Sequence, residues 1–187
     1  KTFIREFCRL LVAEPYRLRL QVPNGLRADM VNRETLELLK SAGLRNVGFG
    51  IESGNERVLK LIKKGISKDR VRKAVALAKD LDLQTWGFFM MGMPGDNEMS
   101  IRETIEFAIE LDVKFAKFLI LKPFPGSEVY YQLDERGLVD SRDFGTYGVY
   151  MPPVHHLDDL SAERILELQR HAFRRFYFRP AKIWDHV

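Results

Sequence analysis

Cysteine is scarce in this chain of 187 residues, which contains only Cys8. One cysteine cannot form a disulfide within the chain, which is typical of proteins of the reducing cytoplasm, and one thiolate cannot hold a metal cluster. The apolar face of a helix predicted over residues 1–14 includes Cys8. We therefore expect Cys8 to be a small core residue and not a ligand or a nucleophile.

Long apolar runs and a strong excess of one charge are missing too. No run approaches the roughly 20 residues of a membrane helix, and no signal-peptide pattern is present, so we expect a cytoplasmic protein without a membrane partner. The composition, 45% hydrophobic and 30% charged, is typical of a globular domain with a substantial core, and the formal net charge is only +4. That charge permits a nucleic-acid partner without arguing for one.

Motifs of several common enzyme classes are absent as well. The sequence has no nucleophile elbow, Walker loop, CxxC pair or HExxH motif. His155 and His156, followed by Asp158 and Asp159, are residue types that bind metals. Adjacent residues do not easily converge on one ion, however, and no third histidine lies at ligand spacing, so we predict no metal site in this chain.

The sequence does contain one pattern that occurs three times: an apolar run, a turn rich in Gly or Pro, and then a capping residue and a Glu that open a helix. Strands predicted over residues 46–51, 85–91 and 115–121 each lead into such a turn. In parallel α/β folds, ligands bind beyond the carboxyl ends of the strands. The repeated pattern therefore predicts that these turns share one pocket mouth.

The first of these turns contains Glu52, Ser53 and Gly54, and Asn55 follows as a predicted N-cap. A carboxylate accepts hydrogen bonds from hydroxyl or ammonium groups, and a glycine lets a ligand approach the backbone closely. The alternative is an ordinary βα turn, in which Glu52 is solvated and Asn55 only caps the next helix. Both interpretations fit the sequence.

The order of predicted elements is that of an α/β fold with a parallel sheet. We expect strands over residues 17–22, 46–51, 85–91 and 115–121 to be parallel neighbours in that order, with helices on the outer face. Helices are predicted over residues 1–14, 33–42, 56–63, 69–81, 98–111 and 127–135. These elements make residues 1–139 one part of the chain. Residues 140–187 form another, with an extended loop to residue 157 and a final helix over residues 164–178 that Pro180 ends.

Two residues near the first predicted strand are candidate ligand contacts. The alternating pattern of residues 16–22 should end at Pro23-Asn24-Gly25, so that Asn24 and Arg27 lie just beyond the strand. The guanidinium of Arg27 can bind an anion through two parallel hydrogen bonds. More often such an arginine pairs with a neighbouring acid, and here Asp29 is the nearest candidate.

The final predicted helix is basic and aromatic. Its arginines include Arg170, Arg174 and Arg175, and Arg179 follows at its end. Such a helix can follow a phosphate backbone, but the chain has no recognisable nucleic-acid-reading motif. We therefore favour a solvated helix face over a nucleic-acid-binding surface.

Three linked motifs resemble those of radical SAM enzymes, and they occur in the order of that superfamily. The segment Phe49-Gly50-Ile51-Glu52-Ser53-Gly54, with residues 58–65 behind it, looks like the fourth-strand region. Residues 87–95 resemble the fifth-strand motif, and residues 122–127 resemble the end of the sixth strand. The resemblance runs from about residue 16 to the C-terminus. It is strongest to the branch with an N-terminal cobalamin-binding domain and to methylthiotransferase-like barrels.

The resemblance implies a partial (β/α) barrel of parallel strands with outer helices, truncated at its N-terminus. The superfamily holds a [4Fe–4S] cluster on a CxxxCxxC loop after the first strand and binds the amino group of S-adenosyl-L-methionine (SAM) at a glycine-rich motif after the second. This chain has neither motif, so we expect the C-terminal two-thirds of the barrel and a fragment without activity of its own. In the intact enzyme, the cluster would reduce SAM to release a 5′-deoxyadenosyl radical, or would serve cobalamin-linked methyl transfer.

The resemblance also implies where SAM binds. Glu52 and Ser53 fall at the position that contacts the ribose or the amino-acid end of SAM, and Asn24 and Arg27 are weaker candidates for polar contacts. The residues expected beside the adenosine are Gly92, Met93 and Pro94. Residues 140–187 would cap the substrate side or meet a neighbouring domain.

Other functions and partners stay open at this point. The substrate is a small molecule or RNA, so an RNA-modifying methylthiotransferase-like enzyme is one alternative. A non-catalytic nucleic-acid-binding α/β module is another. We also expect the chain to self-associate through residues 16–22 or the helix over residues 1–14, because an unpaired strand edge with Leu18 and Leu20 recruits other chains.

Overall fold

The computed structural model describes residues 2–16 and 18–185. Lys1, predicted to begin the first helix, and Arg17, predicted to lie in the first strand, fall outside the described residues. The chain divides into two compact units. Unit 1 comprises Lys1–Ile51, Ile66–Phe88 and Leu111–Phe115, and unit 2 comprises Glu52–Gly65, Phe89–Glu110 and Ala116–Val187.

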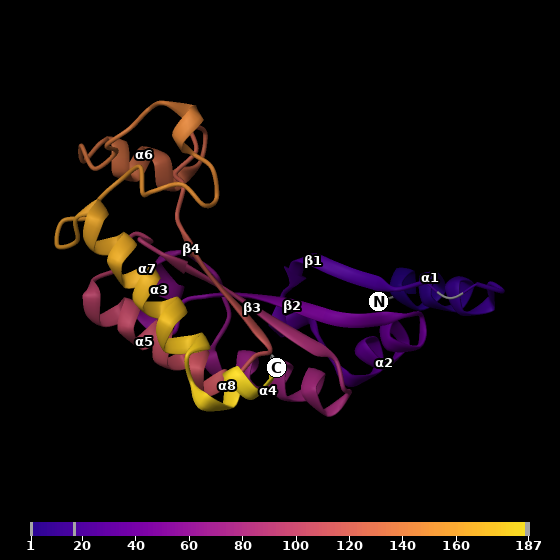
Figure 1. Cartoon of the computed structure of the whole chain (residues 1–187). Helices are drawn as coiled ribbons and strands as arrows, with labels where there is room; N and C mark the ends of the chain where they lie inside the picture. Colours follow the sequence, from indigo (N-terminus) through magenta and orange to yellow (C-terminus); the bar gives the residue numbers. More distant parts are fainter. Residues whose placement is uncertain (1, 17, 186–187) are drawn as a thin grey trace. The chain divides into compact units, whose positions relative to one another are not determined.

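The strands form one sheet with the predicted order of neighbours. Strands β1 (Leu20–Leu26), β2 (Leu44–Glu52), β3 (Gln84–Met91) and β4 (Phe115–Ile120) lie side by side in the order β1-β2-β3-β4. Figure 1 labels all of them. The pair β1 and β2 is parallel, with Leu20 opposite Leu44 and Val22 opposite Val47. The fold is therefore the predicted α/β fold with a parallel sheet.

The first strand differs from its prediction. The pattern predicted a strand over residues 16–22 that stops at Pro23, whereas β1 starts at Leu20 and continues to Leu26. Its register with β2 shifts between Val22 and Leu26, since Val22 pairs with Val47 and Leu26 with Phe49. An irregularity of this kind accommodates a proline, which has no N–H for the ladder, and a glycine at positive φ, which Gly25 adopts at +76°. Asn24 consequently lies inside β1 and not beyond it.

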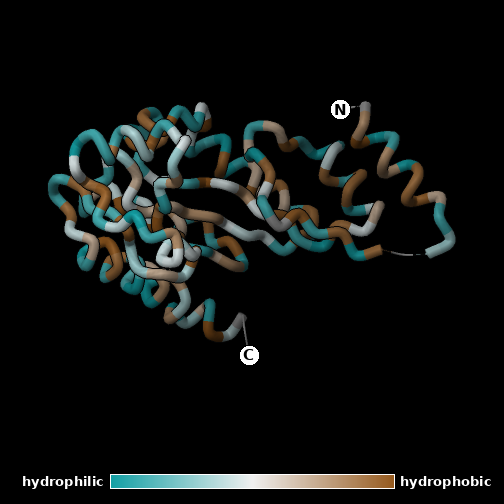
Figure 2. The backbone as a smooth tube through the Cα atoms, turned by 90° about the horizontal axis from the view of Figure 1, so that it is seen from above, coloured by the Kyte–Doolittle hydropathy of each residue, from teal (hydrophilic) through white to brown (hydrophobic). Residues whose placement is uncertain are grey.

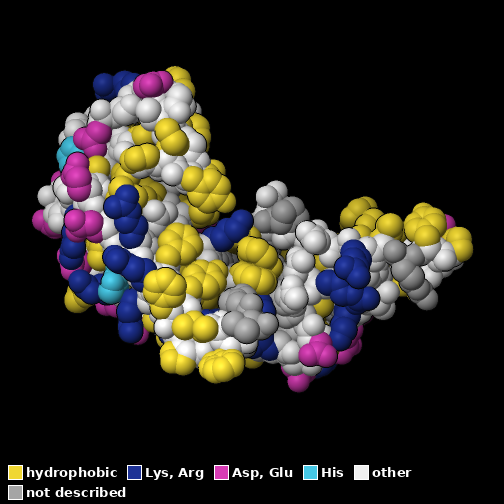
Figure 3. All heavy atoms as spheres, viewed as in Figure 1, with side chains coloured by type: hydrophobic (Ala, Val, Ile, Leu, Met, Phe, Trp, Pro, Cys, Tyr) yellow, Lys and Arg dark blue, Asp and Glu magenta, His cyan; other side chains and the backbone are white. Residues whose placement is uncertain are grey.

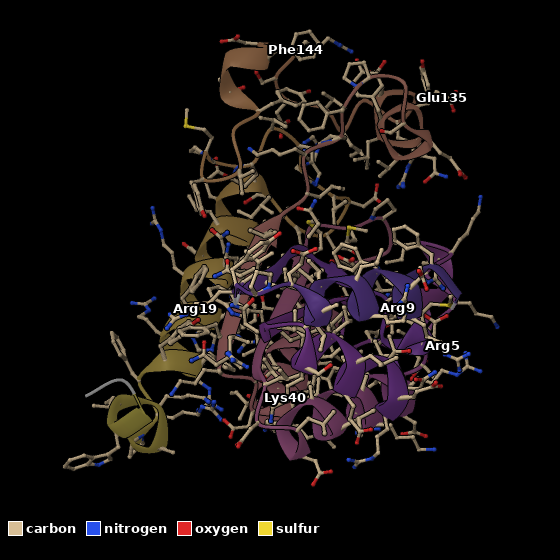
Figure 4. The ribbon with its side chains drawn as sticks, turned by 90° about the vertical axis from the view of Figure 1, so that its right-hand side faces the viewer. Arg5, Arg9, Arg19, Lys40, Glu135 and Phe144 are labelled. Atoms are coloured by element: carbon tan, nitrogen blue, oxygen red, sulfur yellow. The ribbon has the colours of Figure 1, made fainter. Side chains whose placement is uncertain are left out.

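Unit 1 contains the helices α1 (Thr2–Ala13), α2 (Arg33–Ser41) and α4 (Lys68–Asp80) and the short 3-10 helix η1 (Ala28–Met30). Asn32 caps α2, because its side chain accepts a hydrogen bond from the N–H of Thr35 at 2.9 Å. Ser67 caps α4 in the same way. Arg5 of α1 forms an ion pair with Glu34 of α2 at 2.6 Å, and Figure 4 shows Arg5 and Arg9 at the same outer edge.

Helix α1 is amphipathic, and Figure 2 shows hydrophobic and hydrophilic residues alternating along it from the N label. Its Cys8 is only 1% exposed. Burial raises the pKa of the Cys8 thiol, which keeps it protonated and unreactive. The prediction that Cys8 is a core residue is confirmed.

Unit 2 holds α3 (Glu56–Leu61), most of α5 (Glu98–Leu111), α6 (Glu128–Asp134), η2 (Phe144–Thr146), α7 (Ala162–Tyr177) and α8 (Pro180–Asp185). The sequence predicted that Pro180 would end the last helix, but the proline opens a further helix, α8. Proline is well tolerated at the first position of a helix, because the N–H that it lacks would have no partner there.

The core of unit 2 forms where α7 covers β4. Phe118 of β4 lies 5.3 Å from the ring of Phe89 and 5.3 Å from that of Phe173. The side-chain amide of Gln169 donates to the carbonyl of Phe118 at 2.7 Å. Arg175 of α7 pairs with Glu106 of α5 at 2.9 Å, and Figure 1 shows these two helices side by side. Helix α7 is thus part of the core of its unit.

The segment over residues 139–157 contains η2 and an isolated antiparallel bridge between Val139 and His155, and is otherwise irregular, as predicted. Several of its apolar side chains stay exposed, and Figure 3 shows hydrophobic side chains gathered over this segment and α6. Phe144 is 62% exposed and Tyr150 is 86% exposed. Within the part of the chain that the structure covers, no helix is long and apolar enough to cross a membrane.

Candidate functional site

The carboxyl end of β2 carries a strained glutamate. Glu52 has a φ of +69°, in the left-handed region that residues other than glycine rarely adopt. Its Oε1 accepts a hydrogen bond from Lys64 Nζ at 2.6 Å, and the two side chains are only 21% and 23% exposed. A left-handed backbone costs a glutamate about 1–2 kcal/mol, and such outliers concentrate at functional sites. No residue pattern predicted this conformation.

The next two residues are held by α5. The hydroxyl of Ser53, which is 2% exposed, lies 3.2 Å from the hydroxyl of Thr104 and accepts a hydrogen bond from the N–H of Asn55 at 3.1 Å. The N–H of Gly54 donates to the same Thr104 hydroxyl at 2.9 Å. A Cβ on Gly54 would come within 2.6 Å of the backbone oxygen of Glu103. Ser53 and Gly54 therefore fix the backbone beside Glu52, and Gly54 is needed for packing on α5.

The carboxyl end of β3 leads into a turn over residues 92–95, here called the β3 turn. Its first residue, Gly92, has a φ of +76°. Asp96 ends the turn: its Oδ2 accepts a hydrogen bond from the N–H of Met93 at 3.0 Å, and its Oδ1 accepts one from the hydroxyl of Ser100 at 2.6 Å. Asp96 is 7% exposed, and burial raises its pKa to about 6 in spite of these bonds. The sequence analysis missed Asp96, although an aspartate directly after a Pro-Gly turn is a usual turn-stabilising residue.

The β2 end and the β3 turn are linked through α3. Arg57 of α3 donates to the carbonyl of Gly95 at 2.6 Å. A Cβ on Gly95 would lie 2.4 Å from the Cδ1 of Leu61, so the turn packs directly on this helix. Because α3 starts just after Gly54, the structure brings the first two predicted turns together within one unit.

A cavity of about 310 Å³ opens beside the β3 turn. Met93 and Pro94 form one wall, Leu61 and Ile62 at the end of α3 form another, and Ser127 and Val129 at the start of α6 close it. Lys63 and Glu128 also line it and form an ion pair at 2.7 Å, with both side chains largely exposed. Residues from the second and third predicted turns thus meet at one largely apolar cavity, whereas Glu52–Asn55 of the first turn are not among its lining residues. The predicted shared mouth is confirmed for two of the three turns.

Asn24 and Arg27 belong to unit 1. Both are exposed. The guanidinium of Arg27 forms two hydrogen bonds with the carboxylate of Asp29, at 3.1 and 3.0 Å. The alternative that Arg27 pairs with a neighbouring acid is therefore confirmed.

The adjacent histidines have separate partners. His155 Nε2 lies 2.8 Å from the carbonyl oxygen of Gly92, whereas His156 Nδ1 lies 2.7 Å from the carboxylate of Asp140. Across residues 2–16 and 18–185, no group of three His, Cys, Asp or Glu side chains is placed to hold a metal ion.

Several arginines of the C-terminal helix bind α5. Arg164 pairs with Glu98 at 2.8 Å, Arg175 pairs with Glu106, and Arg179 donates to the carbonyl of Ile109 at 3.2 Å. Hydrogen bonds from Arg164, and then from Arg102 of α5 itself, lower the pKa of Glu98 to about 2. Arginines engaged in this way stabilise the unit, which favours a structural role over phosphate binding.

Comparison with known protein families decides the affiliation. Residues 3–108, more than half of the chain, match the model of the radical SAM superfamily. The chain belongs to the radical SAM superfamily. The predicted resemblance to that superfamily is thereby confirmed, and the match includes the strand ends at residues 49–54 and 87–95.

Individual relatives add detail. The chain is 33% identical to an uncharacterized methyltransferase of Pyrococcus horikoshii over 82% of its own length and 33% of that protein. It is 30% identical to the cytidylyl-2-hydroxyethylphosphonate methyltransferase of Streptomyces wedmorensis over 87% of its length and 33% of that enzyme. The chain spans about a third of the length of these curated relatives.

A solved structure agrees with the fold. The radical SAM methyltransferase TsrM of Kitasatospora setae, determined with cobalamin and a [4Fe–4S] cluster bound, is 25% identical, with a TM-score of 0.63. The match covers 72% of this chain and 27% of TsrM. The chain is therefore similar to a member of the superfamily whose structure contains bound cobalamin.

Proposed function

We propose that this chain forms the SAM-binding part of a radical SAM enzyme that catalyses cobalamin-linked methyl transfer or another reaction of the 5′-deoxyadenosyl radical. The observation that carries the proposal is Glu52, a partly buried carboxylate held in a left-handed conformation at the end of β2. Similarity to two methyltransferases supports methyl transfer, and similarity to TsrM supports cobalamin as a second cofactor.

The chemistry of Glu52 suits the polar end of SAM. A carboxylate accepts charge-assisted hydrogen bonds from an ammonium group and ordinary ones from ribose hydroxyls. Lys64 already places an ammonium group 2.6 Å from Oε1, which supports the proposal that this carboxylate binds a cationic group. In the proposed site, Glu52 orients SAM, Lys64 holds the carboxylate in place, and Ser53 positions the backbone from its bond with Thr104.

The β3 turn suits the adenosine end. Gly92 has no side chain, and Met93 and Pro94 provide half-buried apolar surface at the cavity wall. An apolar wall of this kind excludes water from a flat ring and fixes its position. Asn24 and Arg27 are weaker candidates, since the fork of Arg27 is occupied by Asp29.

The residues present do not fit the [4Fe–4S] cluster that the superfamily uses. Such a cluster is held by several thiolates, and this chain has Cys8 alone, buried in unit 1 with a raised pKa. The cluster supplies the electron that cleaves SAM, and no part of that step is assigned to residues of this chain.

A nucleic-acid-binding function receives less support. Two of the four arginines that suggested it, Arg175 and Arg179, bind α5. The proposal therefore takes a small-molecule methyl acceptor over RNA as the substrate, and a salt-dependent affinity for RNA would reverse that choice.

The experiment is SAM binding to the full-length protein and its Glu52→Gln and Glu52→Ala variants, measured by calorimetry. Loss of a charge-assisted hydrogen bond should weaken SAM binding about tenfold or more, with Glu52→Ala affected at least as strongly as Glu52→Gln. Glu34→Gln is the matched control, since Glu34 is an ion-paired glutamate of α2, in unit 1. Wild-type affinity in both Glu52 variants would refute the site.

A further inference from the structure

His155 lies outside every motif that relates this chain to its family, yet it is completely buried. The bridge between Val139 and His155 and the hydrogen bond from the N–H of His156 to the carbonyl of Leu138, at 3.0 Å, anchor this stretch of backbone. The imidazole projects from it toward the β3 turn, and Nε2 lies 2.8 Å from the carbonyl oxygen of Gly92, 63 residues away in sequence.

The hydrogen bond determines the tautomer of the ring. A carbonyl oxygen only accepts, so Nε2 of His155 must carry the proton and donate it to Gly92. Nδ1 then bears a lone pair, and it is buried without a hydrogen-bond partner among the residues described. Burial lowers the pKa of His155, against the effect of the Gly92 bond, and keeps the ring neutral. Burying Nδ1 without a hydrogen-bond partner is unfavourable. The favourable interaction that explains a histidine at this position is therefore the hydrogen bond from Nε2.

The bond from His155 completes a set of contacts on the β3 turn. Asp96 accepts from the N–H of Met93, its own N–H donates to the carbonyl of Met93 at 2.8 Å, and Arg57 donates to the carbonyl of Gly95. His155 is the contact on the carbonyl of Gly92, where the backbone adopts positive φ. A Cβ on Gly92 would lie 3.0 Å from His155 Nε2, so the ring abuts the glycine directly. The next two residues, Met93 and Pro94, form the cavity wall.

We propose that His155 is a positioning residue, which holds the β3 turn in the conformation that binds the adenosine end of SAM. The inference rests on the proposed function of that turn. His155 does not touch the cofactor, since its ring is buried behind Gly92. It acts through the carbonyl of Gly92 on the orientation of Met93 and Pro94.

The test uses His155→Leu, which keeps much of the volume and removes the donor, and His155→Gln, whose side-chain amide can still donate. His156→Gln is the matched control, because His156 is the adjacent imidazole and binds the surface residue Asp140. Amide hydrogen exchange of Met93 and Asp96 is measured on the full-length protein without SAM, and SAM affinity is measured by calorimetry. Circular dichroism verifies that each variant is folded.

In His155→Leu, we expect exchange at Met93 and Asp96 to accelerate about tenfold and SAM binding to weaken about five- to tenfold, as for the loss of one hydrogen bond. His155→Gln should recover at least half of both effects on a logarithmic scale, and His156→Gln should show neither. Should the leucine variant fail to fold, a wild-type exchange rate in His155→Ala or no difference between His155→Ala and His155→Gln would overturn the inference.

The two proposals fail in different ways. Unchanged exchange in His155→Leu overturns the positioning role of His155, even if Glu52→Ala weakens SAM binding. Faster exchange with unchanged SAM affinity overturns the inference as stated and removes the β3 turn from the SAM site.

Discussion

The β2 end and the β3 turn belong to the same unit, yet they are built in opposite ways. At the β2 end, helix α5 fixes the backbone through the Thr104 hydroxyl and close packing on Gly54, and a charged side chain, Glu52, is left to act. At the β3 turn, the side chains of Asp96 and His155 fix the backbone, and the turn presents peptide groups and apolar surface. The first arrangement offers a charged group, and the second offers an apolar surface of fixed shape. SAM has a charged amino-acid end and a flat adenine, and such a pair of sites suits it.

The contrast predicts that added volume harms the β2 end more than the β3 turn. In Gly54→Ala, the new Cβ would lie 2.6 Å from the backbone oxygen of Glu103 and 2.7 Å from the Cα of Thr104. Backbone of a packed helix cannot yield easily, so we expect unfolding free energy to fall by about 3 kcal/mol. In Gly92→Ala the nearest atoms belong to the His155 and Ile165 side chains, at 3.0 Å and beyond. There, left-handed strain should dominate, at about 1–2 kcal/mol.

Urea denaturation of the two variants measures this difference. An equal loss in both would show that the packing of Gly54 on α5 is looser than the structure indicates. A larger loss in Gly92→Ala would reverse the contrast.

Titration of Asp96 makes the stability of the fold depend on pH, and the direction of its pKa shift determines the sign of that dependence. The pKa of Asp96 rises from 3.8 to about 6 on folding, so the folded state binds the proton more tightly. The group therefore stabilises the fold fully below about pH 4, and this contribution is lost as the pH rises to about 6, at most about 3 kcal/mol in all. Asp96→Asn should lack this fall between pH 4 and 6, because an amide does not titrate in this range. Its amide oxygen can still accept the hydrogen bond from the N–H of Met93, so the turn should keep its geometry.

Melting temperatures measured against pH follow this effect. His155 contributes in the opposite sense, because its pKa is lowered from 6.5 on folding and its contribution is lost as the pH falls below that value. Comparison of the pH profiles of Asp96→Asn and His155→Gln separates the contribution of Asp96 to stability from that of His155. An unaltered pH profile in Asp96→Asn would mean that Asp96 titrates normally in the fold.

The smallest expected effect concerns the rim of the cavity. The Lys63–Glu128 ion pair is exposed, with side-chain accessibilities of 72% and 63%. Glu128→Gln should change the unfolding free energy by less than about 0.5 kcal/mol, since exposed pairs contribute little. Thermal denaturation at low and high salt measures this change. A loss of unfolding free energy above about 1 kcal/mol would show that this ion pair stabilises the site. The contrast between the β2 end and the β3 turn assigns no such role to the rim of the cavity.

Local sequence rules predicted much of this molecule. The cap Asn55 was identified from residue type and position, and α5 has the predicted bounds. The order of the strands followed from the alternation of helix and strand patterns. These features depend on interactions within a few residues, or on the general rule that parallel strands connected by helices pair in sequence order. The self-association predicted for residues 16–22 stays a prediction.

The features missed by sequence reasoning depend on contacts between distant residues. Strand β1 continues past Pro23 because β2 offers it a partner with a shifted register. Glu52 adopts positive φ because α5 fixes the residues that follow it. The contact between His155 and Gly92 joins residues 63 positions apart. From the sequence, the adjacent histidines were considered only as metal ligands, and their spacing argued against that role. Patterns of residue type do not encode such pairs.

The most direct test of the central claim is a crystal structure of the full-length protein with SAM bound. The account predicts that the amino group or the ribose hydroxyls of SAM lie within about 3.2 Å of the Glu52 carboxylate. It also predicts that the adenosine packs on Gly92, Met93 and Pro94, with the His155 bond to Gly92 intact. SAM bound away from Glu52, with that carboxylate still engaged only by Lys64, would contradict it.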